Sequence, residues 1–220
     1  MKKFACTLML SALSLHVSFN AWAGPEEDLQ RSVSRMDMAG IEKAVDKALE
    51  KGAKAETLKI KGQPLLLWAV KEGQLSLVKK LLEKGVSIET RGPAGETPLM
   101  LAAASSSHEL FYFLLNRKAN LNAADKMGFT VLMYAADAHQ VEHVKVLIEK
   151  GANLLAKTHK GRNALINAAF WGHADLVKLY LAKKVPLHER DRDGKNAYNY
   201  AQSKHWNDVL ELLQNAGAFE

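Results

Sequence analysis

The chain has 220 residues, of which 48% are apolar and 25% charged, and its formal net charge is +6. This composition excludes an intrinsically disordered, collagen-like or polytopic membrane protein. The one cysteine, Cys6, excludes an intramolecular disulfide framework, a cysteine zinc site and a cysteine-ligated iron–sulfur cluster.

The first 23 residues have the organisation of a secretory signal peptide. Lys2 and Lys3 form a short basic segment, residues 4–17 are almost wholly apolar, and Ala21-Trp22-Ala23 places small residues where a signal peptidase reads them. A membrane anchor is the disfavoured alternative, because the apolar run is shorter than the about 20 residues of a membrane span. We therefore predict cleavage near Ala23 and export to the bacterial periplasm. Loss of Lys2 and Lys3 lowers the net charge from +6 to +4.

A repeat with a period of 33 residues dominates the rest of the chain. Glycines mark the period at Gly62, Gly95, Gly128, Gly161 and Gly194. Seven positions after each glycine stands an alanine: Ala69, Ala102, Ala135, Ala168 and Ala201. The period predicts an N-terminal linker and capping repeat (24–61), four repeats (62–94, 95–127, 128–160 and 161–193) and a C-terminal capping repeat (194–220).

Each unit is expected to contain two short antiparallel helices and a turn. In the clearest unit Thr97 is placed to cap a helix that begins at Pro98, and a second helix is expected from about Glu109 to Arg117. A further glycine column, Gly52, Gly85, Gly151 and Gly217, falls where the second helices should end, with Lys118 and Lys184 in the two remaining slots. A single unit cannot bury its apolar face alone, so the units are expected to stack.

These residues resemble the ankyrin repeat, which has a 33-residue unit and a Thr-Pro-Leu-His-x-Ala signature. The likeness rests on Thr97-Pro98-Leu99 followed by Ala102-Ala103, on the stretch from Gly172 to Val177, and on the stretch from Leu147 to Asn153. It implies an all-α solenoid of helix–turn–helix units joined by β-hairpin-like turns, with about six units including irregular terminal caps. The signature histidine is replaced in every unit, by Leu67, Met100, Met133, Ile166 and Asn199.

The sequence offers little catalytic or metal chemistry. His139 and His143 lie four residues apart with Asp137 near, which is one spacing of a metal site, but His139 falls in a turn and a shared helical face is doubtful. His173 matches the family's own Gly-His position, which implies a structural role. Ser105-Ser106-Ser107 precedes His108 without the other parts of a serine triad, and the glycines do not form a phosphate loop. We therefore expect no enzyme activity, no cofactor and no metal.

The resemblance also places the variable, partner-facing positions beside each turn glycine and after the paired alanines. The candidate partner-binding residues are Met127, Phe129, His159, Arg162, Phe170, Trp171, Arg192, Lys195 and Lys204. They combine aromatic residues at positions that are expected to be exposed with a strip of basic residues. This combination favours a partner that presents acidic groups. The alternatives are packing between repeats for Phe170 and Trp171, and simple solvation for the basic residues.

These patterns predict a non-enzymatic periplasmic module, monomeric when free and without a membrane span after cleavage, that binds one folded protein. By analogy of architecture and compartment, the partner could be a peptidoglycan hydrolase or a toxin, which the protein would inhibit as a self-protection or immunity protein. The alternative is a structural adaptor, or a stabiliser of a periplasmic stress enzyme or of the cell-wall surface. Nucleic acid is not expected as a partner, because the basic residues are spread over every unit.

Overall fold

The computed structural model describes residue 32 and residues 38–219, which fall into two compact units that are treated separately. The predicted signal peptide (1–23) and most of the predicted linker (24–37) lie outside the described residues. The first unit extends to Gly62 and contains helix α2 (Met38–Glu50), the short 3-10 helix η1 (Ala55–Thr57) and strand β1 (Lys59–Ile60). Helix α2 buries one side through Ile41, Ala44, Val45 and Ala48.

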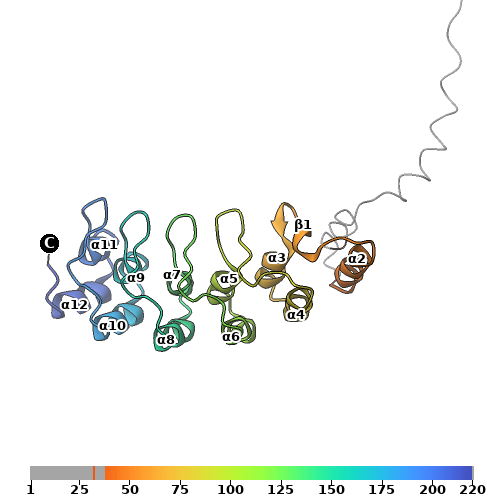
Figure 1. The fold of residues 1–220 in the computed structure, drawn as a ribbon. Coiled ribbons are helices and arrows are strands. Elements are labelled where there is room, and N and C mark those ends of the chain that lie inside the picture. Colours follow the sequence, from red (N-terminus) through yellow and green to blue (C-terminus); the bar gives the residue numbers. More distant parts are fainter. Residues whose placement is uncertain (1–31, 33–37, 220) are drawn as a thin grey trace, which may run out of the picture. The chain divides into compact units, whose positions relative to one another are not determined.

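The second unit begins at Gln63 with the two-residue strand β2 (Gln63–Pro64) and continues as a series of helix pairs. The pairs are α3 (Leu65–Lys71) with α4 (Leu75–Glu83), α5 (Pro98–Ala104) with α6 (His108–Asn116), α7 (Val131–Asp137) with α8 (Val141–Glu149), α9 (Ala164–Trp171) with α10 (Ala174–Ala182), and α11 (Ala197–Ser203) with α12 (Asn207–Asn215). Figure 1 shows them stacked in chain order, with the long turns between pairs projecting from one side. The predicted all-α solenoid is confirmed, and α6 begins and ends one residue earlier than expected.

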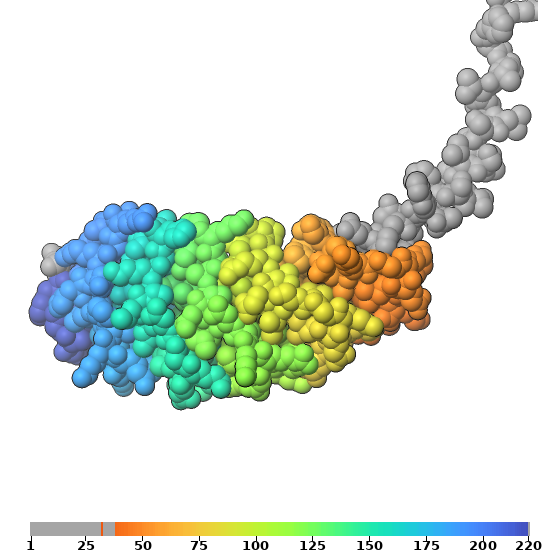
Figure 2. All heavy atoms as spheres, in the orientation of Figure 1, coloured from red at the N-terminus to blue at the C-terminus, as the bar shows by residue number. Residues whose placement is uncertain are grey.

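The first helix of each pair carries the alanine column and lies inside the stack. Helices α3, α5, α7, α9 and α11 contact one another in succession, and every alanine of the column is buried. Small side chains let these helices approach closely, while large buried side chains such as Phe111 and Tyr180 fill the space beside them. Figure 2 shows the resulting contiguous layers of atoms, from yellow to blue.

A side-chain cap starts each inner helix from α5 onward. Thr97, Thr130, Asn163 and Asn196 each stand two residues after a column glycine, and each side-chain oxygen accepts the N–H of the third residue that follows it. The predicted roles of Thr97 and Pro98 are thereby confirmed. Met100 occupies one signature histidine position, and its sulfur accepts the N–H of Thr97 at 3.4 Å. The reciprocal hydrogen bond of this capping box is therefore made by a methionine sulfur in place of an imidazole.

Backbone hydrogen bonds join each turn to the next one. The N–H of Lys126 donates to the carbonyl of Ala94 at 2.9 Å, that of His159 to Met127 at 2.8 Å, and that of Arg192 to Lys160 at 2.9 Å. These bonds use no side chain, so they tolerate any residue except proline at the donor positions. They hold the turns in register while leaving the tip side chains free to vary.

Two of the column glycines are required by these turn-to-turn contacts as well as by their own dihedral angles. Gly95 and Gly128 have φ of +87° and +81°, a region in which an L side chain is strained. A Cβ on either residue would also lie 2.9 Å from the backbone nitrogen of the next turn, Lys126 or His159. Gly194 has φ of +73° but nothing within 4 Å of its Cβ position.

Within the described ranges, no helix is both long and apolar enough to cross a bilayer.

Alanine substitutions separate the two requirements of the column. We expect Gly194→Ala to lower the free energy of unfolding by about 1–2 kcal/mol through backbone strain alone. Gly128→Ala should lose about 1–3 kcal/mol more, because its methyl group also forces the His159 backbone away and breaks the bond between the turns. Urea denaturation followed by circular dichroism measures the difference, and equal losses would show that the contact between turns carries no stability.

Candidate functional site

Five of the nine sequence-predicted residues come together on α9, α11 and the turns before them. Arg162, Phe170, Trp171, Lys195 and Lys204 come together with Tyr200, which the sequence analysis did not single out. These six residues are called the aromatic–basic cluster. Both turns and both inner helices contribute to it, so it belongs to two successive repeats.

Phe170 is the centre of the aromatic–basic cluster. Its ring meets Trp171 and Tyr200 edge to face, with centroids 5.0 and 5.4 Å apart. The guanidinium of Arg162 lies 4.6 Å from the Phe170 centroid, and the ammonium of Lys204 lies 5.2 Å from it. Edge-to-face rings and cation–π contacts each stabilise such a group modestly, and together they fix the side chains in one arrangement. The packing predicted as the alternative role of Phe170 is therefore present.

Asp191 anchors Arg162 from beneath. Its carboxylate accepts the hydroxyl of Tyr200 at 2.6 Å, the Nε–H of Arg162 at 3.4 Å and the backbone N–H groups of Asp193 and Lys195. Burial alone would raise the pKa of Asp191, but these donors together hold it below its ordinary value. Arg162 also donates to the Tyr200 hydroxyl at 3.0 Å, so its guanidinium is largely satisfied within the protein.

Trp171 presents the largest apolar surface of the cluster, with 49% of the residue exposed. Its indole lies beside the carboxyl group of Asp137, which accepts the side-chain amide of Asn167. Trp171 is therefore held from two sides, by Asp137 and by the Phe170 ring. Trp206 packs against the same turn: its indole N–H donates to the carbonyl of Phe170 at 3.3 Å, and its ring lies against Gly172.

Lys195 and Lys204 supply the exposed positive charge. Lys195 lies 5.5 Å from the Tyr200 ring, and Lys204 lies beside Phe170. Neither forms an ion pair with a carboxylate among residues 38–219. Their charges therefore face solvent.

The other four predicted residues lie on the turns, outside the aromatic–basic cluster. The side chains of Met127, His159 and Arg192 are exposed at turn tips, held by the backbone bonds between turns. Phe129 is half-buried and packs edge to face on Tyr134, with centroids 6.5 Å apart. In the part of the chain that the structure describes, none of these four side chains forms a hydrogen bond, ion pair or ring contact with the cluster.

His139 and His143, considered as a metal pair, point to different neighbours. His143 is fully buried, and its Nδ1 donates to the carbonyl of Ala103 while Nε2 lies 2.7 Å from Nδ1 of His108. His139 instead contacts Asp175 at 2.9 Å and stacks on His173. Burial lowers the pKa of both His143 and His173. Among the described residues, no three His, Cys, Asp or Glu side chains are grouped to hold a metal ion.

The three consecutive serines, residues 105–107, follow the C-terminus of α5. The Ser105 hydroxyl donates to the carbonyl of Ala102 at 2.9 Å and accepts the N–H of Ser107. It thus caps the C-terminus of α5, and His108 is engaged by His143 instead. The arrangement of this region is that of a turn, with no nucleophile–base contact between Ser105 and His108.

The surroundings of Asp137 strongly shift the pKa of its carboxyl group. Burial raises its pKa to about 7, although the neighbouring Trp171 indole and the charge of Arg162 both oppose the rise. The native state then holds a proton between about pH 4 and pH 7 that the unfolded chain has released. Stability from this group is fully present below about pH 4 and falls as the pH rises through 7.

Asp137→Asn should therefore raise the free energy of unfolding at pH 8, by an amount on the order of 1–3 kcal/mol, and have little effect at pH 4. The amide keeps an oxygen for the Asn167 donor but removes the buried charge. Asp193→Asn, at an exposed position in a turn, is the matched control and should change stability little at either pH. Urea denaturation at the two values measures this, and equal effects of Asp137→Asn at both would contradict the assignment.

A search of curated proteins gave no match. The family model for ankyrin repeats, in three copies, matches residues 66–158. The aromatic–basic cluster lies beyond the matched residues, on helix pairs that continue the same stack with the same caps and turn-to-turn bonds. The chain thus contains ankyrin repeats, and its helix pairs form an all-α ankyrin-repeat solenoid.

Proposed function

We propose that the protein is exported to the periplasm, loses its signal peptide near Ala23, and binds one folded protein there through the aromatic–basic cluster. Ankyrin repeats indicate a protein–protein interaction module, and they are generally non-catalytic. The location of the binding surface, the compartment and the consequence of binding are the proposal.

The observation that carries the proposal is the exposed indole of Trp171 on a fixed support. Burying this half-exposed ring against a partner contributes about 2 kcal/mol, and little conformational entropy is lost because Phe170 and Asp137 already hold it. Trp and Arg are the residue types that most often dominate binding energy at interfaces. The site thus has the composition and the rigidity of an interface centre.

The turn tips supply further exposed positions outside the cluster. Met127, His159 and Arg192 occupy exposed positions on three successive turns, which backbone bonds keep in register. Their side chains can follow the partner's surface without disturbing the solenoid. A partner that covers Trp171 and these tips spans several repeats, which fits a folded protein better than a small molecule.

We propose inhibition as the specific consequence of binding, with a peptidoglycan hydrolase or an incoming toxin as partner. A rigid surface spread over several repeats suits coverage of an active-site cleft, and an exported binding module shares the compartment of such enzymes. The proposal rests on architecture and predicted compartment. If saturating protein leaves the activity of the captured enzyme unchanged, inhibition is excluded and stabilisation of a periplasmic stress enzyme becomes the better account.

The adaptor function draws on the net charge of +4 predicted after cleavage. Attachment of this kind to the cell-wall surface depends on exposed charges, so moderate salt should abolish it and Trp171→Ala should not. Sedimentation with purified peptidoglycan at two salt concentrations distinguishes this function from binding through the aromatic–basic cluster.

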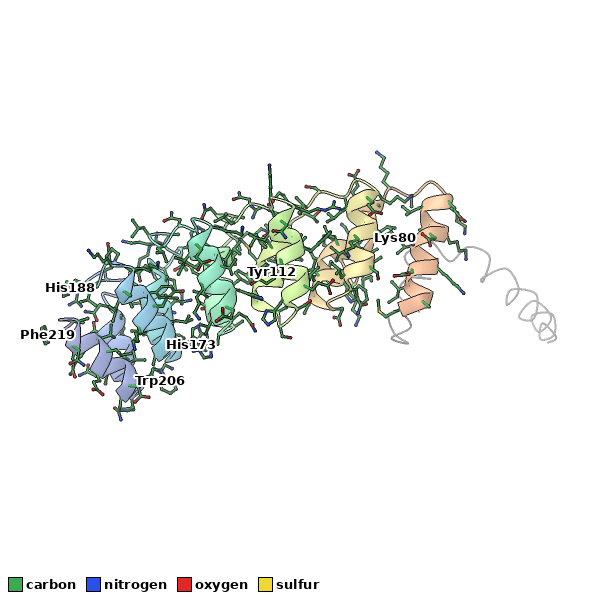
Figure 3. All side chains as sticks on the ribbon, turned by 90° about the horizontal axis from the view of Figure 1, so that it is seen from below. Lys80, Tyr112, His173, His188, Trp206 and Phe219 are labelled. Atoms are coloured by element: carbon green, nitrogen blue, oxygen red, sulfur yellow. The ribbon has the colours of Figure 1, made fainter. Side chains whose placement is uncertain are left out.

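Affinity capture from periplasmic extract tests the main proposal, with immobilised residues 24–220 as bait. Trp171→Ala should weaken capture of the partner by about 30-fold, because about 2 kcal/mol of binding energy is lost. The matched control is Tyr112→Ala, which removes a partly exposed aromatic residue from the outer helix α6 (Figure 3) and should leave capture unchanged. Equal recovery by wild type and Trp171→Ala would move the binding surface elsewhere.

A further inference from the structure

Besides Asp191, which is bonded to Arg162 and Tyr200, the acidic side chain of Asp137 borders this surface. Asp137 ends α7 at the position that Phe170 holds in α9 and Ser203 holds in α11, each 33 residues apart. Its carboxyl group accepts the side-chain amide of Asn167 and lies beside the indole of Trp171. Asp137 therefore touches the residue that we place at the centre of the interface.

Few charged groups compensate the carboxylate of Asp137. From the α9 side the one cation that acts on it is Arg162, whose guanidinium is already bonded to Asp191 and Tyr200. From α10 the nearby titratable groups are the buried hydroxyl of Tyr180 and, at the start of that helix, the imidazole of His173. Both are uncharged at neutral pH, because burial raises the pKa of Tyr180 and lowers that of His173.

The remaining neighbouring elements add no compensating charge. Tyr134, on α7 itself, is neutral, and α5 carries no titratable side chain. On α8 the charged residues Glu142, Lys145 and Glu149 are exposed, and Glu142 and Lys145 pair with each other. His139, in the turn after α7, is paired with Asp175. The carboxylate of Asp137 is thus poorly stabilised, in keeping with its raised pKa.

The exposed cations indicate what the partner brings to the surface. Lys195 and Lys204 flank the cluster without a carboxylate of their own, while the charge of Arg162 is used internally. The carboxylates of an acidic segment would pair with both lysines, and the segment would cover Trp171. The same negative charges would further destabilise the carboxylate of Asp137, which lies in contact with Trp171.

We infer, building on the proposed function, that the partner segment seated on the aromatic–basic cluster is acidic and that Asp137 takes up a proton from solvent as this segment docks. The proton binds a carboxylate oxygen of Asp137 and is released again on dissociation. Docking therefore replaces a repulsion between like charges with a neutral carboxylic acid that can donate a hydrogen bond.

The linkage fixes the direction of the pH dependence. Affinity is highest where Asp137 is protonated in the free protein, and it falls as the pH rises through the value at which the free protein loses that proton. If docking raises the pKa of Asp137 by about one unit, affinity falls about tenfold from pH 6 to pH 9. The side chain of Asp137→Asn is neutral at every pH, so the affinity of this variant lacks this part of the pH dependence.

The test uses two synthetic peptides, an acetylated hexaglutamate amide and its hexaglutamine counterpart, titrated into residues 24–220. The readout is the indole N–H resonance of Trp171 in ¹H–¹⁵N spectra, assigned by its loss in Trp171→Ala, which detects even weak binding. We expect saturable shifts with hexaglutamate alone, and an affinity for it about tenfold lower at pH 9 than at pH 6. Equal shifts with both peptides, or no shift with either, would overturn the inference that the docked segment is acidic.

A comparison of Asp137→Asn with a matched control tests whether Asp137 takes up the proton. The variant should bind hexaglutamate with only the residual pH dependence that the histidines contribute, whereas Asp208→Asn, an exposed change in α12, should keep the wild-type profile. Identical profiles for wild type and Asp137→Asn would overturn proton uptake. None of these outcomes bears on the proposed function, which fails separately if Trp171→Ala captures the partner as well as wild type does.

Discussion

The hydrogen bond from each turn to the next is the constraint on which the rest of the structure depends. It links backbone atoms 32 residues apart, at Lys126 and Ala94 or at His159 and Met127. It needs a glycine at the close approach, as at Gly95 and Gly128, and a repeat of constant length, which fixes the period. Once the turns are in register, the caps two residues later begin each inner helix at the same height, and the alanines seven residues later meet inside the stack.

The same constraint explains why the fold could be predicted from the sequence. Each requirement acts on a residue at a fixed distance from a column glycine, so it leaves a visible column: Gly for the approach, Thr or Asn for the cap, Ala for the close contact. Lys118 and Lys184 interrupt a column without disturbing the fold, because both adopt the left-handed backbone of the glycine that they replace, with φ of 61° and 56°. The cost of each replacement is local.

The site was predictable only in part, because its contacts join residues about one period apart. Phe170, Trp171 and Arg162 are conspicuous by residue type, but the sequence does not distinguish packing from exposure, and the structure shows Phe170 doing the packing and Trp171 exposed. Tyr200 was missed, although Asp125 with Tyr134 and Asp191 with Tyr200 repeat one hydrogen-bonded pair at the same positions. Asp137 resembles any solvated residue at a helix end, since the groups that surround it come from the following repeat.

The aromatic–basic cluster straddles two helix pairs, and this has a consequence for its persistence. In a solenoid each pair is stabilised by its immediate neighbours, so the folding of one pair depends on that of the next. Helix α12 buries little beyond Val209 and Leu213, yet the pair that it closes supplies Tyr200 and Lys204. The complete cluster therefore exists only while α11 and α12 are folded, and a bound partner adds its binding free energy to the stability of that pair. Recognition and the local folding of the α11–α12 pair are one equilibrium.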